Sequence, residues 1–145
     1  KTLLMSSISL ELLQEAILQL IMKQSGLTQR EIDNAKDREV KKGCLILTKK
    51  EYEEKAFKNR KDFKFVIAKN LKTVSYQLFR ESSLQFGFMP EVESIASCTF
   101  CGCPLTAICF LKVKSVDYWA FNDCLLLSKV FLPVCEELGD CCFVG

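Results

Sequence analysis

The chain has 145 residues, of which 49% are hydrophobic and 26% charged, and its formal net charge is +2. This length and balance fit one globular domain and exclude a chain that is disordered throughout. The chain has nine cysteines and no histidine. The absence of histidine excludes Ser-His and Cys-His nucleophile pairs and every metal site that needs imidazole. We therefore expect a protein that is not an enzyme, with no catalytic residues.

We expect a single domain over residues 1–145, with a helical, basic half at 1–61 and a sheet-forming, cysteine-rich half at 62–145. The chain starts with Lys1 rather than Met, which indicates a fragment of a longer protein. No apolar stretch reaches the roughly 20 residues that a bilayer requires, and we therefore expect no membrane partner.

Two helices are predicted at the N-terminus. Apolar residues between Leu10 and Met22 recur at helical spacing, and Gly26 ends this pattern. A capping box then begins at Thr28, with Glu31 three residues later, and predicts a second, mostly polar helix that ends at Gly43. These two elements form an N-terminal helical pair.

The middle of the chain alternates between apolar and polar residues. After a short apolar strand at 44–47 and a charged helix that begins at Thr48, three segments at 63–68, 73–78 and 84–89 alternate with period two. Short polar links separate these segments. This pattern is typical of an antiparallel meander with one buried face.

The last third predicts a central strand at 105–113 and a helix from Ser115 to Phe131 that is apolar nearly all round and therefore buried. We find no internal repeat in the sequence. The predicted fold class is α+β, an antiparallel sheet of about four to six strands with helices packed on it.

Eight of the nine cysteines lie from Cys98 onward. The sharpest local motif is Cys98, Cys101 and Cys103, which offers two or three thiolates for a structural zinc ion, with partners from the C-terminal cysteines. A second Cys-x-x-Cys pair is missing, and we expect mainly free, buried thiols, with a metal site or disulfides as the alternatives. We expect no cofactor, with zinc as the alternative.

The segment 36–72 is basic, with 13 Lys and Arg against 6 Asp and Glu. Basic residues interleaved with aromatic residues can bind single-stranded nucleic acid through phosphate contacts and stacking, and a solvated basic face explains the same pattern. The candidate contacts are Lys49, Lys50, Lys58, Arg60 and Lys61.

The first helix carries more apolar positions than one buried stripe needs, which indicates a partner. Leu12, Leu18 and Met22 are the predicted partner contacts, and a homodimer is the first expectation. We therefore predict a non-catalytic protein-interaction or assembly domain inside the cell, in the cytoplasm or nucleus. The alternative is a nucleic-acid-binding or zinc-stabilised regulatory module.

Overall fold

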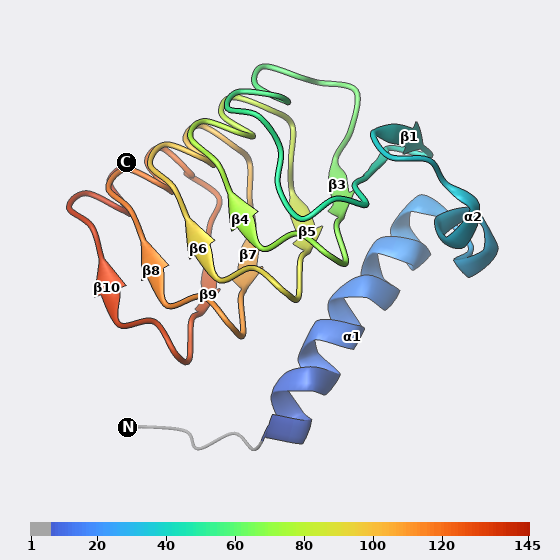
Figure 1. The fold of residues 1–145 in the computed structure, drawn as a ribbon, viewed down its shortest axis with the longest axis horizontal. Helices are drawn as coiled ribbons and strands as arrows, with labels where there is room; N and C mark the ends of the chain where they lie inside the picture. The colour runs from blue at the N-terminus through green and yellow to red at the C-terminus, as the bar shows by residue number, and fades with distance from the viewer. Residues whose placement is uncertain (1–6) are drawn as a thin grey trace.

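The computed structural model describes residues 7–145. Short parallel strands stack into a β-solenoid of about five turns, and one long helix lies along its side (Figure 1). In chain order the elements are α1 (Ser7–Ser25), α2 (Gln29–Asn34), β1 (Glu39–Lys41), β2 (Cys44–Ile46), β3 (Phe65–Ile67), β4 (Thr73–Val74), β5 (Phe86–Phe88), β6 (Ser94–Ile95), β7 (Ala107–Cys109), β8 (Ser115–Val116), β9 (Lys129–Phe131) and β10 (Glu137–Leu138).

The solenoid repeats every 21 or 22 residues. On one side, Cys44 pairs with Phe65 and Phe65 with Phe86, in parallel register. The next two strands continue this side, with Ala107 paired to Lys129. Our expectation that the chain has no repeat is wrong, because each turn returns the backbone to the same place one strand further along.

The other side is the parallel sheet β4–β6–β8–β10. Between the two sheets runs a ladder of phenylalanine rings, one from each turn, with centroids of neighbouring rings 5.2 to 5.7 Å apart. Offset stacking of this kind adds to the free energy gained by burying each ring. The ladder consists of Phe57, Phe79, Phe100, Phe121 and Phe143.

Each ladder ring sits in a tight bend that requires left-handed backbone on both sides. Around Phe100, for example, Cys98 has φ 58° and Gly102 has φ 73°. The backbone N–H groups of the bend donate to the next turn, as Phe100 does to the carbonyl of Ala120 at 2.8 Å. Because the bend recurs in each turn, its polar backbone groups find partners without long strands.

Helix α1 covers the outer face of the sheet that contains β3 and β5. Leu18 and Ile21 pack there against Phe65 and Phe88 and form a second, smaller core. The predicted capping box at Thr28 is confirmed. Helix α2 is shorter than predicted, because a β1–β2 hairpin follows it.

The predicted fold class is wrong. Every strand pair except β1–β2 is parallel, so the molecule is a β-solenoid rather than an antiparallel α+β sheet. The segments predicted to form helices from Thr48 and from Ser115 are bends and strands of the solenoid. In the first of them, Phe57 donates from its backbone N–H to the carbonyl of Leu78 in the next turn, at 3.0 Å.

Candidate functional site

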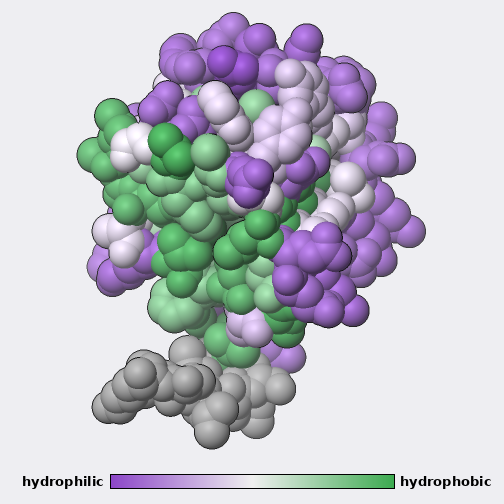
Figure 2. Space-filling model, turned by 90° about the vertical axis from the view of Figure 1, so that its left-hand side faces the viewer, coloured by the Kyte–Doolittle hydropathy of each residue, from purple (hydrophilic) through white to green (hydrophobic). Residues whose placement is uncertain are grey.

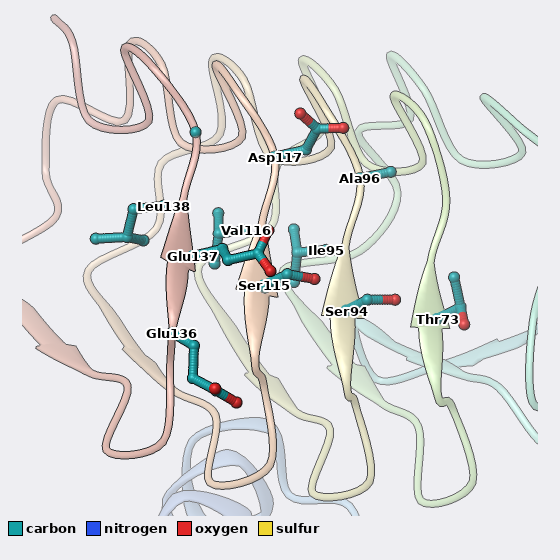
Figure 3. Close-up of a pocket in the computed structure, with 11 residues that line it drawn as sticks. Thr73, Ser94, Ile95, Ala96, Ser115, Val116, Asp117, Glu136, Glu137 and Leu138 are labelled. Atoms are coloured by element: carbon teal, nitrogen blue, oxygen red, sulfur yellow. The ribbon is translucent and has the colours of Figure 1, made fainter.

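The outer face of the sheet β4–β6–β8–β10 carries a shallow hollow of about 680 Å³ (Figure 3). A row of small hydroxyl side chains lines it, Thr73, Ser94 and Ser115, one from each of three neighbouring strands. Ile95 and Val116 lie on the opposite side of the same strands and belong to the core. Because the parallel register repeats this alternation in each turn, the hydroxyl groups line up across the sheet.

Aromatic side chains lie beside this hollow, where the chain leaves β8. Tyr118 is 50% exposed and Trp119 is 46% exposed. Together with Tyr76 they line a second hollow of about 410 Å³. Trp119 has φ 63°, but an equivalent left-handed residue occurs in the neighbouring turns. The conformation therefore belongs to the repeat and does not by itself mark a strained functional residue.

The end of the first hollow at β8 and β10 is acidic. Asp117, Glu136 and Glu137 line it, and all three are exposed. Asp117 accepts a hydrogen bond from the backbone N–H of Tyr118 at 2.7 Å. Carboxylates can only accept hydrogen bonds, whereas the hydroxyl groups can donate or accept. The face therefore suits a ligand that has N–H donors and that carries positive charge where it lies against the β10 end.

The predicted zinc ligands lie in one turn but in different surroundings. Cys98 is half-buried, whereas Cys101 and Cys103 are buried. The thiol of Cys103 donates to the carbonyl of Phe79 at 2.9 Å, and the sulfur of Cys101 accepts from the Asn122 amide at 3.8 Å. In the described part of the chain, no three Cys, Asp or Glu side chains are placed to hold a metal ion. Zinc binding stays a prediction without geometric support.

The thiols of Cys103, which is buried, and of Cys124, which is half-buried, act as hydrogen-bond donors in the repeat. Cys124 stands one turn after Cys103, and its thiol donates to the carbonyl of Phe100 at 3.1 Å. Burial raises the pKa of Cys103 to about 11 and that of Cys124 to about 12. Since the thiolate is the reactive form, these two cysteines are poor nucleophiles and poor metal ligands.

The basic residues predicted to contact nucleic acid all belong to the first turn of the solenoid. Three of them are engaged within the chain, and one of these is Lys61, whose Nζ donates to the carbonyl of Glu81 at 2.5 Å. Lys49 lies 3.9 Å from a carboxylate oxygen of Asp37, and Arg60 forms two hydrogen bonds of 2.6 and 2.7 Å with Asp62. Nucleic-acid binding stays a prediction for the set Lys49, Lys50, Lys58, Arg60 and Lys61.

The three predicted partner contacts on α1 differ in exposure. Leu12 is 65% exposed, Leu18 is only 4% exposed, and Met22 is half-buried against the second core. Leu18 holds the helix on the sheet and is not accessible to a partner, which corrects the expectation for this residue. Neither helix in the described part of the chain has the length and apolarity needed to cross a membrane.

Sequence reasoning did not select the hydroxyl row or the aromatic residues beside it. Tyr118 falls within the helix predicted from Ser115 to Phe131, which is expected to be buried because its residues are apolar nearly all round. The 21-residue interval that joins Thr73, Ser94 and Ser115 was the signal that could have revealed the row.

The repeat seen in the structure corresponds to a known family. Residues 50–145 match, in six copies, the family described as BspA type leucine rich repeat region. Comparisons with curated proteins and with solved structures give no match. Repeats of this family are generally protein-interaction modules and typically serve as non-catalytic scaffolds.

Proposed function

The chain belongs to the BspA type leucine-rich repeat family, and we propose that it binds another protein through the outer face of the sheet β4–β6–β8–β10. The observation that carries the proposal is the hydroxyl row with exposed Tyr118 and Trp119 beside it. Tyrosine and tryptophan are enriched among the residues that contribute most to binding at protein interfaces. Because the side chains of the hydroxyl row are small, the backbone of a partner can approach the sheet closely.

The chemistry of the face defines the partner segment that it fits. The hydroxyl groups of Thr73, Ser94 and Ser115 can hydrogen-bond to an extended backbone laid across the strands. Asp117 and Glu137 favour a Lys or Arg at the β10 end of that segment. The segment is therefore extended and basic at one end.

We further propose that the chain acts without catalysis and inside the cell. The absence of histidine supports the first point, since the usual general base is missing. The cysteines support the second, because Cys103 and Cys124 donate hydrogen bonds as free thiols, which suits a reducing compartment.

The test uses the single tryptophan of the chain, which lies at the proposed site. A library of ten-residue peptides is displayed and selected on the purified protein, and binding of each selected peptide is followed by Trp119 fluorescence. We expect Tyr118→Ala to weaken binding by about 10- to 100-fold. Ser115→Arg should abolish binding, because the long cationic side chain fills the row. Leu12→Arg, on the exposed side of α1, is the control and should bind as the parent does.

Peptides that bind both Ser115→Arg and Tyr118→Ala with parental affinity would place the binding surface elsewhere. The nucleic-acid alternative makes a different prediction for a single-stranded RNA probe. Its binding should weaken steeply with salt and respond to Lys58→Glu rather than to Ser115→Arg.

A further inference from the structure

The aromatic residues beside the hydroxyl row lie in interior turns of the solenoid. Figure 2 views the molecule from the β10 end and shows a hydrophobic area there with hydrophilic side chains around it. Tyr76 and Tyr118 belong to earlier turns. In the turn before Tyr76, the backbone N–H of Lys55 donates to the Tyr76 carbonyl at 3.0 Å. Next to Tyr118, the N–H of Trp119 donates to the carbonyl of Asp140, in the turn after, at 3.2 Å. Described residues therefore flank both tyrosines.

Tyr76, Ser97 and Tyr118 occupy the same position in three successive turns. The carbonyl of Ser97 accepts a hydrogen bond from the N–H of Gln77 at 3.3 Å. One turn later, the carbonyl of Tyr118 accepts the equivalent bond from the N–H of Cys98 at 3.4 Å. Aromatic rings thus stand at the first and third of these positions, with a small side chain at the second.

The phenylalanine ladder shows what fits between rings that are two turns apart. In the same three turns, the centroid of the Phe100 ring lies 5.6 Å from that of Phe79 and 5.2 Å from that of Phe121. Rings at equivalent positions two turns apart are therefore spaced for one ring between them. In the column of Tyr76 and Tyr118 that middle ring is missing, because Ser97 stands in its place.

The hollow of about 410 Å³ lies at this gap. Tyr76 lines it from the first turn, half-buried Cys98 lines it from the second, and Tyr118 and Trp119 line it from the third. The side-chain amide of Gln77 donates to the hydroxyl of Tyr76 at 2.9 Å. One wall is thereby held in place before a ligand binds, which lowers the entropic cost of binding. The volume is within the range of small-ligand sites.

Polar side chains line the same hollow. Arg80 and Glu81 do so in the first turn, and Asn122 and Asp123 in the third. The guanidinium and the amide can donate hydrogen bonds, and the carboxylates can accept them. A peptide backbone offers both acceptors and donors beside each of its side chains. The hollow therefore suits a ring that is carried on a peptide better than it suits a free hydrocarbon.

We propose that this hollow is a slot for one aromatic side chain of a partner protein, which takes the place of the missing ring between Tyr76 and Tyr118. The inference rests on the proposed function, because it places this side chain in the segment bound along the hydroxyl row. Ser94 of that row and Cys98 of the slot are four residues apart in the same turn. A ring in the slot gains from contact with aromatic residues on both sides.

A small probe tests the slot without the rest of the segment. N-acetylphenylalanine amide is titrated into the isotopically labelled whole chain, and N-acetylleucine amide is the matched apolar probe without a ring. We expect the phenylalanine probe to shift the amide resonances of Cys98 and Asn122, with a dissociation constant on the order of 1 mM. The leucine probe should bind about 5- to 100-fold more weakly. Equal binding of the two probes, or no shift at these amides, overturns the proposal.

Cys98→Trp is the variant that blocks the slot. The equivalent residue one turn later is Trp119, and the two share a left-handed backbone, with φ 58° at Cys98 and 63° at Trp119, so the repeat accommodates this side chain. Cys98→Trp should abolish binding of the phenylalanine probe. Cys98→Ser leaves the slot open and should bind as the parent does. Tyr76→Leu, which removes one ring of the wall, should weaken binding severalfold and keeps the test decisive if Cys98→Trp fails to fold. Probe binding that neither Cys98→Trp nor Tyr76→Leu changes overturns the proposal.

Peptides selected on the protein separate this proposal from the proposed function. We expect each to contain an aromatic residue whose replacement by leucine weakens binding to the parent about 5- to 100-fold. The same replacement should have little effect on binding to Cys98→Trp. Peptide binding that Ser115→Arg abolishes but Cys98→Trp leaves unchanged would refute the slot alone. Phenylalanine-probe binding that Cys98→Trp abolishes, together with peptide binding that Ser115→Arg leaves unchanged, would support the slot and refute the proposed function.

Discussion

At the N-terminal end of the solenoid, the guanidinium groups of Arg38 and Arg60 lie 5.6 and 5.9 Å from the ring centroid of Phe57, the first ring of the ladder. At the other end, Phe143 has no such cover and is 43% exposed. Arg38 is held in place by Glu53, through two hydrogen bonds of 2.6 and 3.0 Å. The two terminal rings of the described ladder therefore differ, because guanidinium groups cover Phe57 whereas Phe143 is exposed to solvent on one side.

The largest difference should appear along the ladder itself. Phe100 is fully buried and stacks on a ring at each side, so Phe100→Ala should lower the free energy of unfolding by about 3–5 kcal/mol. Phe143→Ala removes a half-exposed ring and should cost about 1 kcal/mol. Urea unfolding of the two variants measures both values. Equal losses would mean that the last turn is as well packed as the middle.

Two glycines allow the backbone packing of the last turn to be compared with that of an earlier turn. A Cβ at Gly139, in the last turn, would lie 2.4 Å from the backbone nitrogen of Tyr118. Gly139→Ala should therefore force β10 away from β8, at a cost of about 1–3 kcal/mol. At Gly87 the added Cβ meets only the end of the flexible Met89 side chain, at 2.3 Å, and Gly87→Ala should cost less. Thermal unfolding that ranks the two variants the other way would contradict this packing.

The cysteines provide a chemical comparison between surface and interior. Cys141 is exposed, whereas Cys103 is buried with its pKa raised to about 11. Iodoacetamide at pH 8 should therefore label Cys141 quickly and Cys103 only after denaturant is added. Cys103→Ala should also lower stability by about 1 kcal/mol, because the carbonyl of Phe79 loses the thiol as a donor and keeps only the backbone N–H of Ser82. Rapid labelling of Cys103 in the native protein would show that this turn opens readily.

The smallest expected effect is the pH dependence of the N-terminal end. Burial opposes the charge of Asp37, but the backbone N–H of Thr48 and the hydroxyl of Tyr52 hold the pKa of Asp37 below its ordinary value of 3.8. The stabilisation is therefore fully present above pH 3.8 and is lost as the pH falls through the lowered pKa.

We expect Asp37→Asn to be less stable than the parent at pH 6 by below about 1 kcal/mol, and the difference to shrink by pH 2. Urea unfolding at the two pH values measures this difference. A gap that does not depend on pH would mean that the carboxylate charge of Asp37 does not stabilise this end.

How much of the fold the sequence reveals depends on how local each signal is. The capping box of Thr28 and the apolar spacing of α1 are contained within a few residues, and both elements were predicted from them. The parallel stacking was missed, because alternation over a strand of three residues is the same in parallel and antiparallel sheets. Short links between alternating segments then favoured a meander.

The repeat was missed because few of its positions keep one residue type. The positions equivalent to Thr99 in the next two turns hold Ala120 and Cys142. Only the position of the ladder rings keeps one residue type, phenylalanine, over 21- or 22-residue steps. The candidate site shares this difficulty, since its hydroxyl row is visible only after the register is known. The structure was also needed to tell which apolar side chains of α1 are exposed, since Leu12 is 65% exposed and Leu18 only 4%.

Hydrogen exchange of the backbone amides, followed along the chain, tests the central claim that the middle turns of the solenoid are packed on both sides, whereas β9 and β10 are packed on one side. Amides of β3 and β5 should exchange slowly and those of β9 and β10 quickly. Exchange of β9 and β10 that is as slow as that of β3 and β5 would contradict the account.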